Sequence, residues 1–180
     1  MSRLLCWLTA ALLVAAGPAA AQSDAPAVDP GTKLSFPSTL GGGSLVRSGG
    51  STAGASYQYA MPNGIEVTVD VYGNGRRVPN GSSHPTVINQ FSDELAVLAQ
   101  ASGGALEKPS VPSACTYGAY TFRCIVFSAG GMGGRQYGKM LLIGYREHFV
   151  KILAQWSQKN SQTVVDADKV LNAFVPALIH

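Results

Sequence analysis

The sequence predicts an α+β domain: an antiparallel sheet with helices packed on it, arranged as a three-layer α-β-α sandwich. The supporting observations are a β-hairpin pattern over 56–72, an almost wholly apolar run over 139–145, and two segments with the 3.6-residue apolar period of helices. The strands cluster between the helical segments, which favours α+β over a parallel nucleotide-binding sheet. An apolar strand is covered on both faces, so the sheet needs a layer on each side.

The hairpin is the clearest local structure. Residues 56–61 and 65–72 each alternate between two sets of side chains, and the turn signal Pro62-Asn63-Gly64 separates them. The two predicted strands therefore share one buried face. The side chains expected on that face are Tyr57, Tyr59, Met61, Ile65, Val67, Val69 and Val71.

Both helices are amphipathic. The first is expected over about 86–101, behind the polar loop 73–85, with Ser82 or Ser83 as its N-cap. The second is expected over roughly 163–178. The side chains that its period would bury are Ala167, Val170, Leu171, Phe174 and Leu178.

Further strands are expected over 115–128, 139–145 and 149–156. With them, the element order over roughly 32–180 resembles the PsbP-like fold, that of the extrinsic oxygen-evolving photosystem protein and its bacterial relatives. The resemblance rests on the segment Phe36-Pro37, on Gly144-Tyr145-Arg146 leading into Phe149, and on the closing helix. The chain is also similar to a class of uncharacterised exported bacterial proteins. This resemblance implies a non-catalytic accessory or binding domain, and it supplies no catalytic residue.

The N-terminus has the pattern of a bacterial secretory signal peptide over 1–21. Arg3 gives the positive start, residues 4–16 are apolar, and Ala19-Ala20-Ala21 forms a small-residue cleavage site. An uncleaved anchor is disfavoured because a span needs about 20 apolar residues. We therefore expect cleavage near Ala21, a flexible leader over 22–31, one domain over 32–180, and a periplasmic or secreted product.

Charge and hydropathy limit the kinds of partner that the chain is expected to bind. The chain has 13 Lys and Arg against 10 Asp and Glu, and loss of Arg3 would leave a net charge of +2. The only basic run is Arg76-Arg77, so nucleic-acid binding is disfavoured. No segment beyond the signal peptide reaches about 18 apolar residues, so no stable membrane insertion is expected after cleavage.

The cysteines predict one disulfide. Cys6 lies inside the expected signal peptide, which leaves Cys115 and Cys124 in an exported chain. A hairpin turning near residues 118–120 would bring the two onto facing strands, whereas one continuous strand would hold them about 30 Å apart. A zinc site is disfavoured, because no histidine lies near this pair.

No segment carries a cofactor pattern, and no cofactor is expected. Residues 130–134 are Gly-rich, but they lack the Gly-x-Gly-x-x-Gly spacing, and a strand rather than a helix follows. The only adjacent Ser-His pair is Ser83-His84, and with Asp93 or Glu94 it could form a hydrolase triad. Sequence neighbours rarely supply that geometry, so a helix cap beside an exposed histidine is favoured.

Three polar residues stand at the tip of the last predicted hairpin, Arg146, Glu147 and His148. Such residues are usually solvated, and a metal or proton-transfer site there is disfavoured. With three histidines spread along the chain, no metal site is expected. The site analysis therefore assigns neither catalytic nor metal-binding residues.

Tyrosines give the best candidate for a binding surface. Seven occur on or near predicted strands, and the four proposed to face a partner are Tyr57, Tyr59, Tyr72 and Tyr145. The favoured function is an exported accessory domain that binds another periplasmic protein without catalysis. The alternatives are a small-ligand binder with a crevice rimmed by the loops 73–85 and 129–138, and an enzyme of an unrecognised type.

Overall fold

The computed structural model describes residues 26–51, 53–73, 75, 77–102, 106–107, 109–130 and 134–180. The expected signal peptide over 1–21 and the first part of the expected leader lie outside the described residues. Within the described residues, no helix is long and apolar enough to cross a bilayer.

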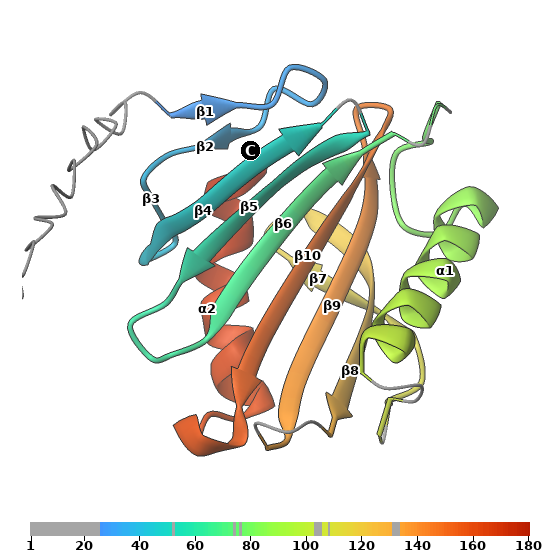
Figure 1. The fold of residues 1–180 in the computed structure, drawn as a ribbon. Coiled ribbons are helices and arrows are strands. Elements are labelled where there is room, and N and C mark those ends of the chain that lie inside the picture. Colours follow the sequence, from blue (N-terminus) through green and yellow to red (C-terminus); the bar gives the residue numbers. More distant parts are fainter. Residues whose placement is uncertain are drawn as a thin grey trace, which may run out of the picture.

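Ten strands and two α-helices make up the described fold (Figure 1). The strands are β1 (Ala27–Val28), β2 (Ser35–Phe36), β3 (Thr39–Leu40), β4 (Gly43–Ser51), β5 (Gly54–Ala60), β6 (Glu66–Tyr72), β7 (Ser113–Tyr117), β8 (Tyr120–Ala129), β9 (Gln136–Tyr145) and β10 (His148–Ser157). The helices are α1 (Pro85–Ala101) and α2 (Val164–Leu178), and the short 3-10 helix η1 (Gln158–Asn160) precedes α2. β1 pairs with β2, and the other strands form one antiparallel sheet in the order β3-β4-β5-β6-β10-β9-β8-β7.

The predicted hairpin is confirmed as β5 and β6. Tyr59 pairs with Val67 across the two strands, and Tyr57 pairs with Val69. Ile65 and both of these valines are completely buried, as the alternation predicted. β10 then pairs with β6, so a strand from the end of the chain extends the hairpin into the middle of the sheet.

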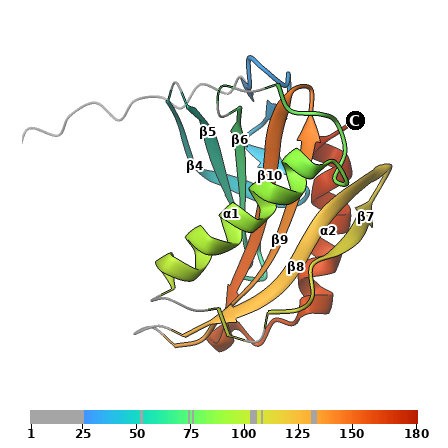
Figure 2. The ribbon, with the colours of Figure 1, turned by 90° about the vertical axis from the view of Figure 1, so that its right-hand side faces the viewer.

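Each helix packs on a different face of the sheet. α2 contacts β3 and β7 at the two edges as well as β10 in the middle, so the sheet curls around this helix (Figure 2). α1 contacts β8 and β9 from the other side. The larger apolar core lies under α2 and the smaller one under α1. The predicted class, α+β with an antiparallel sheet and helices packed on it, is confirmed.

The helix ends follow from short polar contacts. The N-cap of α1 is His84 rather than Ser82 or Ser83, because its Nδ1 accepts the Thr86 N–H at 3.2 Å. α2 begins with a capping box between Thr163 and Asp166. Its predicted buried face is confirmed except for Val170, which is partly exposed.

The region expected to be strand-like over 115–128 is a second hairpin, β7 and β8. It turns at Gly118-Ala119, where Gly118 has a φ of 59°. Cys115 and Cys124 lie on facing strands with their Cα atoms 6.1 Å apart and form the predicted disulfide. The covalent bond therefore holds the edge strand β7 to the rest of the sheet.

The loop between β6 and α1, called the crossing loop below, covers one end of the sheet beside the β9–β10 turn. β8 pairs with β9 only as far as Leu142. Beyond that residue the loop segment 78–81 runs beside β9, and Gly81 and Gly144 exchange two backbone hydrogen bonds of 2.9 Å. A Cβ on Gly144 would meet the carbonyl of Pro79, so this close approach requires glycine. The loop thereby fixes the turn between β9 and β10.

The residues ahead of β2 form an ordered turn. Asp29 is only 6% exposed, and its Oδ1 accepts hydrogen bonds from the Thr32 N–H at 2.7 Å and the Thr32 hydroxyl at 2.6 Å. The sequence alone predicted a flexible leader through Gly31, because residues 22–31 are rich in Ala, Pro, Ser and Asp. Its order depends on a local side-chain contact and on docking against distant residues.

Candidate functional site

A groove of about 1250 Å³ opens at one end of the sheet. It lies where the β1–β2 turn, the tip of the β4–β5 hairpin, the end of β6 and the β9–β10 turn meet (Figure 1). Ligand sites in proteins commonly have volumes of about 300–1000 Å³, so this groove has room for a small molecule. Its lining includes Asp29, Gly31, Tyr57, Arg77, Glu147 and His148.

The described residues of the hairpin tip that line the groove are all small, which leaves the space open. They are Gly50, Ser51, Ala53, Gly54 and Ala55. Gly54 has no space for a side chain, since a Cβ would lie 2.5 Å from the Val71 carbonyl oxygen. The same five small residues also line a second hollow of about 490 Å³ on the α1 side. The hairpin tip thus separates the groove from this second hollow.

Asp29 forms the acidic part of the groove. The hydrogen bonds from Thr32 fix one carboxylate oxygen, Oδ1. The carboxylate is buried on its other sides but lines the groove. Among the described residues, no Lys, Arg or His pairs with it.

His148 presents a hydrogen-bond acceptor in the same groove. Its Nδ1 lies 2.9 Å from the carbonyl oxygen of Arg146 and must donate there, because a carbonyl only accepts. In the neutral ring, Nε2 is then an acceptor. Gly31 packs against this edge of the ring, and a Cβ there would lie 2.5 Å from Nε2. Glycine at this position therefore leaves the histidine in place.

The β9–β10 turn is held rigidly. Arg146 and Glu147 have φ values of 46° and 67°, which is unusual for residues with side chains. The Arg146 N–H donates to Asn80 at 2.8 Å, and its guanidinium donates to the Thr32 carbonyl at 2.9 Å. Glu147 pairs with Arg77 at 2.5 Å. These contacts fix the turn between the crossing loop and the N-terminal turn.

Tyr57 lies at the inner side of the groove. Its ring stacks on Phe36, with the ring centroids 3.5 Å apart. Burial raises the pKa of the Tyr57 hydroxyl, and the negative charge of Asp29 raises it further. The hydroxyl therefore stays protonated and neutral beside the carboxylate.

The second hollow contains an ion-pair network between the sheet and α1. Lys151 on β10 lies 2.8 Å from Glu94 of α1 and 2.9 Å from Asp70 of β6. Tyr72 donates to Glu94 at 2.6 Å, and Gln90 donates to it at 3.0 Å. The network fixes α1 against the sheet and leaves each charged group with a partner.

The electrostatics of this network favour the charged forms. Burial alone would raise the pKa of Glu94, but hydrogen bonds from Lys151 and Tyr72 outweigh burial and lower it. Burial alone would lower the pKa of Lys151, but Asp70 and Glu94 raise it above its ordinary value. The lysine is not a free amine near neutral pH, and the carboxylate is not poised to exchange a proton.

Two of the four predicted partner-facing tyrosines are in the core instead. Tyr57 is 7% exposed and Tyr59 is fully buried, where Tyr59 packs edge-on against Phe174 and donates to the Pro37 carbonyl at 2.9 Å. Burial, and then Tyr57, raise the pKa of Tyr59 to about 12. Alternation placed both residues on one face, but segments remote in sequence cover that face. The prediction fails for this pair.

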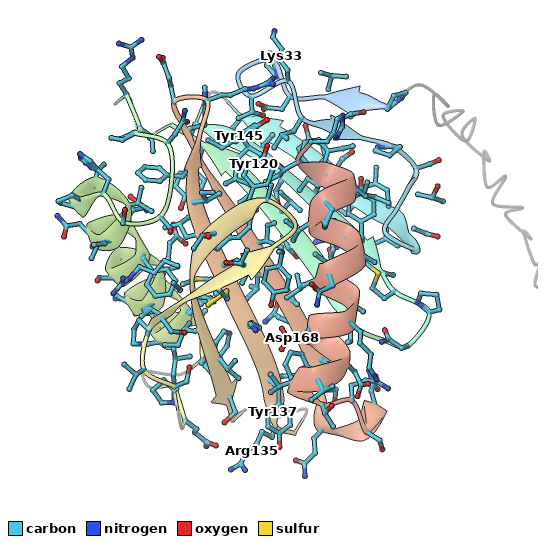
Figure 3. The ribbon with its side chains drawn as sticks, turned by 180° about the vertical axis from the view of Figure 1, so that it is seen from behind. Lys33, Tyr120, Arg135, Tyr137, Tyr145 and Asp168 are labelled. Atoms are coloured by element: carbon cyan, nitrogen blue, oxygen red, sulfur yellow. A yellow bond between two sulfur atoms is a disulfide. The ribbon has the colours of Figure 1, made fainter. Side chains whose placement is uncertain are left out.

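The other two tyrosines are partly exposed and lie in different places. Tyr72 lines both hollows, whereas Tyr145 packs edge-on against Tyr120 with the Arg146 guanidinium over its ring (Figure 3). The structure therefore brings no common tyrosine surface together. Of this second pair only Tyr72 lines the groove, where Tyr57 also lies.

The two loops predicted to rim one crevice lie at opposite ends of the sheet. Gly73, Gly75 and Arg77 of the first loop line the groove. The second loop is next to Arg135 and Tyr137, which lie at the far end from Tyr145 (Figure 3). Loop 73–85 is thus a rim of the groove and loop 129–138 is not.

The hydrolase triad considered for Ser83-His84 with Asp93 or Glu94 is not assembled, and Asp93 is exposed. His84 caps α1, and Glu94 is bound by Lys151. Within the described ranges, no group of three or more His, Cys, Asp or Glu side chains has the arrangement of a metal site.

Sequence reasoning did not identify Asp29, Gly31 or Lys151 as site residues. Their neighbours in the groove and the network come from five separate parts of the chain, and no local pattern reports such a meeting. Comparison with known proteins adds no assignment, because no protein-family model and no curated protein matches the chain.

Proposed function

We propose that the chain is an exported binding protein that holds a small ligand in the sheet-end groove and performs no chemistry on it. The observation that supports this most directly is the groove itself, with the buried carboxylate of Asp29 and the acceptor nitrogen of His148 in its lining. Concave sites with a few convergent polar groups are typical of ligand binding.

The electrostatics of the neighbouring hollow supports a binding function without chemistry. Lys151 and Glu94 are held in charged forms by mutual pairing, so neither is a free nucleophile or base. The described lining of the two hollows contains Ser51 and Ser56 but no Cys, and neither serine forms a hydrogen bond with a His, Asp, Glu or Lys side chain of the described residues.

The exposed apolar side chains argue against an apolar docking patch. The large ones among the described residues are five valines, and they belong to β1, β4, α1, α2 and a loop. Isolated apolar residues on a surface are normal and do not mark an interface. They are Val28, Val46, Val97, Val111 and Val165.

One observation favours a second function, that of an accessory protein. β3 pairs only with Gly43 and Ser44, so residues 46–51 of β4 have no outer neighbour in the described part of the chain. Such an edge binds an extended segment of a partner protein by main-chain hydrogen bonds. Val46→Lys with Ser48→Lys is expected to abolish this docking and leave the groove intact.

The proposal extends to compartment and architecture. The 1–21 pattern supports export, and the Cys115–Cys124 disulfide supports an oxidising compartment such as the periplasm. The placement of α1 and α2 on different faces supports a three-layer α-β-α sandwich of the PsbP-like kind. Export with removal of residues 1–21 is tested by sequencing the N-terminus of the exported protein.

The test is to fill the groove. Ala53 is exposed and lines both hollows, so Ala53→Trp would place a bulky indole ring beside them. Val97→Trp adds the same bulk on the exposed face of α1, away from the groove. Native mass spectrometry of the protein purified gently from the periplasm should show a bound molecule in the wild type and Val97→Trp, and none in Ala53→Trp.

No bound molecule in the wild type, together with no thermal shift in a broad small-molecule screen, would overturn the ligand-binding proposal. The β4 edge would then carry the function. Loss of partner docking in the variant Val46→Lys, Ser48→Lys would distinguish the accessory function from ligand binding.

A further inference from the structure

We propose that the ligand of the groove is a small organic cation whose ammonium or guanidinium group binds the carboxylate of Asp29. This inference rests on the proposed ligand-binding function. It goes further by naming the chemical class of the ligand and the residue that anchors it.

The first argument is the state of Asp29. The side chain is 6% exposed, lines the groove and has no cationic partner among the described residues. Both hydrogen bonds from Thr32 go to Oδ1. A buried carboxylate without a counter-charge is unfavourable, and a cationic ligand in the groove would supply that charge.

The second argument is the balance of donors and acceptors around Asp29. His148 offers an acceptor at Nε2, and Glu147 adds a second carboxylate at the rim. The only described cationic side chain in this lining, Arg77, is held by Glu147 through both its Nε, at 2.6 Å, and its terminal nitrogen. Among the described charged side chains of the lining, Asp29 is therefore the carboxylate left without a cation, which suits a ligand with a cationic N–H group.

The third argument is the sign of the local charge. Asp29 and Glu147 outnumber Arg77 in the groove, and Asp70 and Glu94 outnumber Lys151 in the adjoining hollow. The whole chain, in contrast, has a net charge of +3. Among the described lining residues of both spaces, carboxylates thus outnumber Lys and Arg side chains, which favours cations over anions within them.

Asp29→Asn is the informative variant. Asparagine keeps an Oδ1 that accepts from Thr32, so the turn is retained while the charge is lost. Asp93→Asn makes the same chemical change on the exposed face of α1, away from the groove. Circular dichroism and the melting temperature of both variants establish that the fold is intact.

The experiment is calorimetric titration with matched probes on common carbon skeletons. One set compares 1,5-diaminopentane, 1,5-pentanediol and glutarate, and a larger panel matches each amine or guanidine, agmatine included, with its alcohol and its carboxylate. We expect binding by members of the cationic series only. Asp29→Asn should weaken that binding about ten- to hundredfold, as loss of a charged hydrogen bond does, and Asp93→Asn should not.

The outcomes separate the inference from the function on which it rests. Binding of the alcohols or carboxylates instead, abolished by Ala53→Trp, would overturn the cation and keep the ligand-binding groove. Unchanged cation affinity in Asp29→Asn would overturn the anchor. No binding by any panel member, with no ligand in the periplasmic protein, would overturn both.

Discussion

Lys139 and Lys151 lie on the neighbouring strands β9 and β10 but point to opposite faces of the sheet, and each pairs with a carboxylate of the helix on its face. Lys139 lies 2.6 Å from Asp168 of α2, and Lys151 lies 2.8 Å from Glu94 of α1. In both places a tyrosine of the sheet also donates to the helix carboxylate. The two helices are thus attached by the same three kinds of side chain.

These two attachments differ in burial, which predicts unequal effects of losing the lysine. Lys151→Met leaves Glu94 and Asp70 without their cation in a nearly buried site, and should lower the free energy of unfolding by about 3 kcal/mol. Lys139→Met leaves Asp168, which is 37% exposed, and should cost about 1 kcal/mol. Urea unfolding followed by circular dichroism measures both, with the exposed Lys169→Met as the control expected to change little.

Glu94 predicts an acid-dependent contribution to stability. Its pKa in the folded protein is lower than the ordinary 4.5, because hydrogen bonds from Lys151 and Tyr72 outweigh the opposing effect of burial. Such a group stabilises the fold above its unfolded pKa, and this stabilisation is lost as the pH falls through the folded value. Glu94→Gln should therefore be less stable than wild type at pH 7 and approach it below about pH 4.5. A stability difference that stays constant with pH would contradict this reasoning.

The disulfide is expected to stabilise the fold through the unfolded chain. Cys115 and Cys124 are nine residues apart, and closing so short a loop contributes roughly 2–3 kcal/mol. The double variant Cys115→Ser, Cys124→Ser should lose that much stability in urea. Hydrogen exchange should locate the earliest opening in β7, which has only β8 as a strand neighbour. Uniform exchange across the sheet would argue against a local role.

Gly144 predicts a steric effect at the crossing loop. An alanine there would press its Cβ against the Pro79 carbonyl and separate residues 78–81 from β9, so Gly144→Ala should cost about 1–3 kcal/mol. Gly49 is an exposed strand glycine with open space around it, and Gly49→Ala should stay within about 0.5 kcal/mol of wild type. Thermal unfolding of the pair tests the crowding separately from the general effect of alanine in a strand.

Local patterns predicted the elements well but not the groove. Alternation placed Val67 and Val69 on one buried face, and the apolar period placed Leu171 and Phe174 under the sheet. Those patterns report only which face of an element is apolar. They do not report what covers it.

The covering of a face depends on contacts between distant segments. From the sequence of their strand alone, Tyr57 and Tyr59 could face a partner. In the structure, Phe36 stacks on Tyr57 and Phe174 packs against Tyr59, so both rings are covered. Asp29 gains its environment in the same way, since the groove needs four segments to meet. A short segment with a single acidic residue gives no sign of such a meeting.

The curl of the sheet around α2 has a consequence for the stage of folding at which the larger core can form. Because α2 contacts both edges and the middle of the sheet, the larger core is incomplete until the last fifteen residues of structure, Val164–Leu178, are available. Contacts between residues far apart in the sequence slow folding. A chain in which α2 has not yet docked leaves the apolar face of the sheet uncovered.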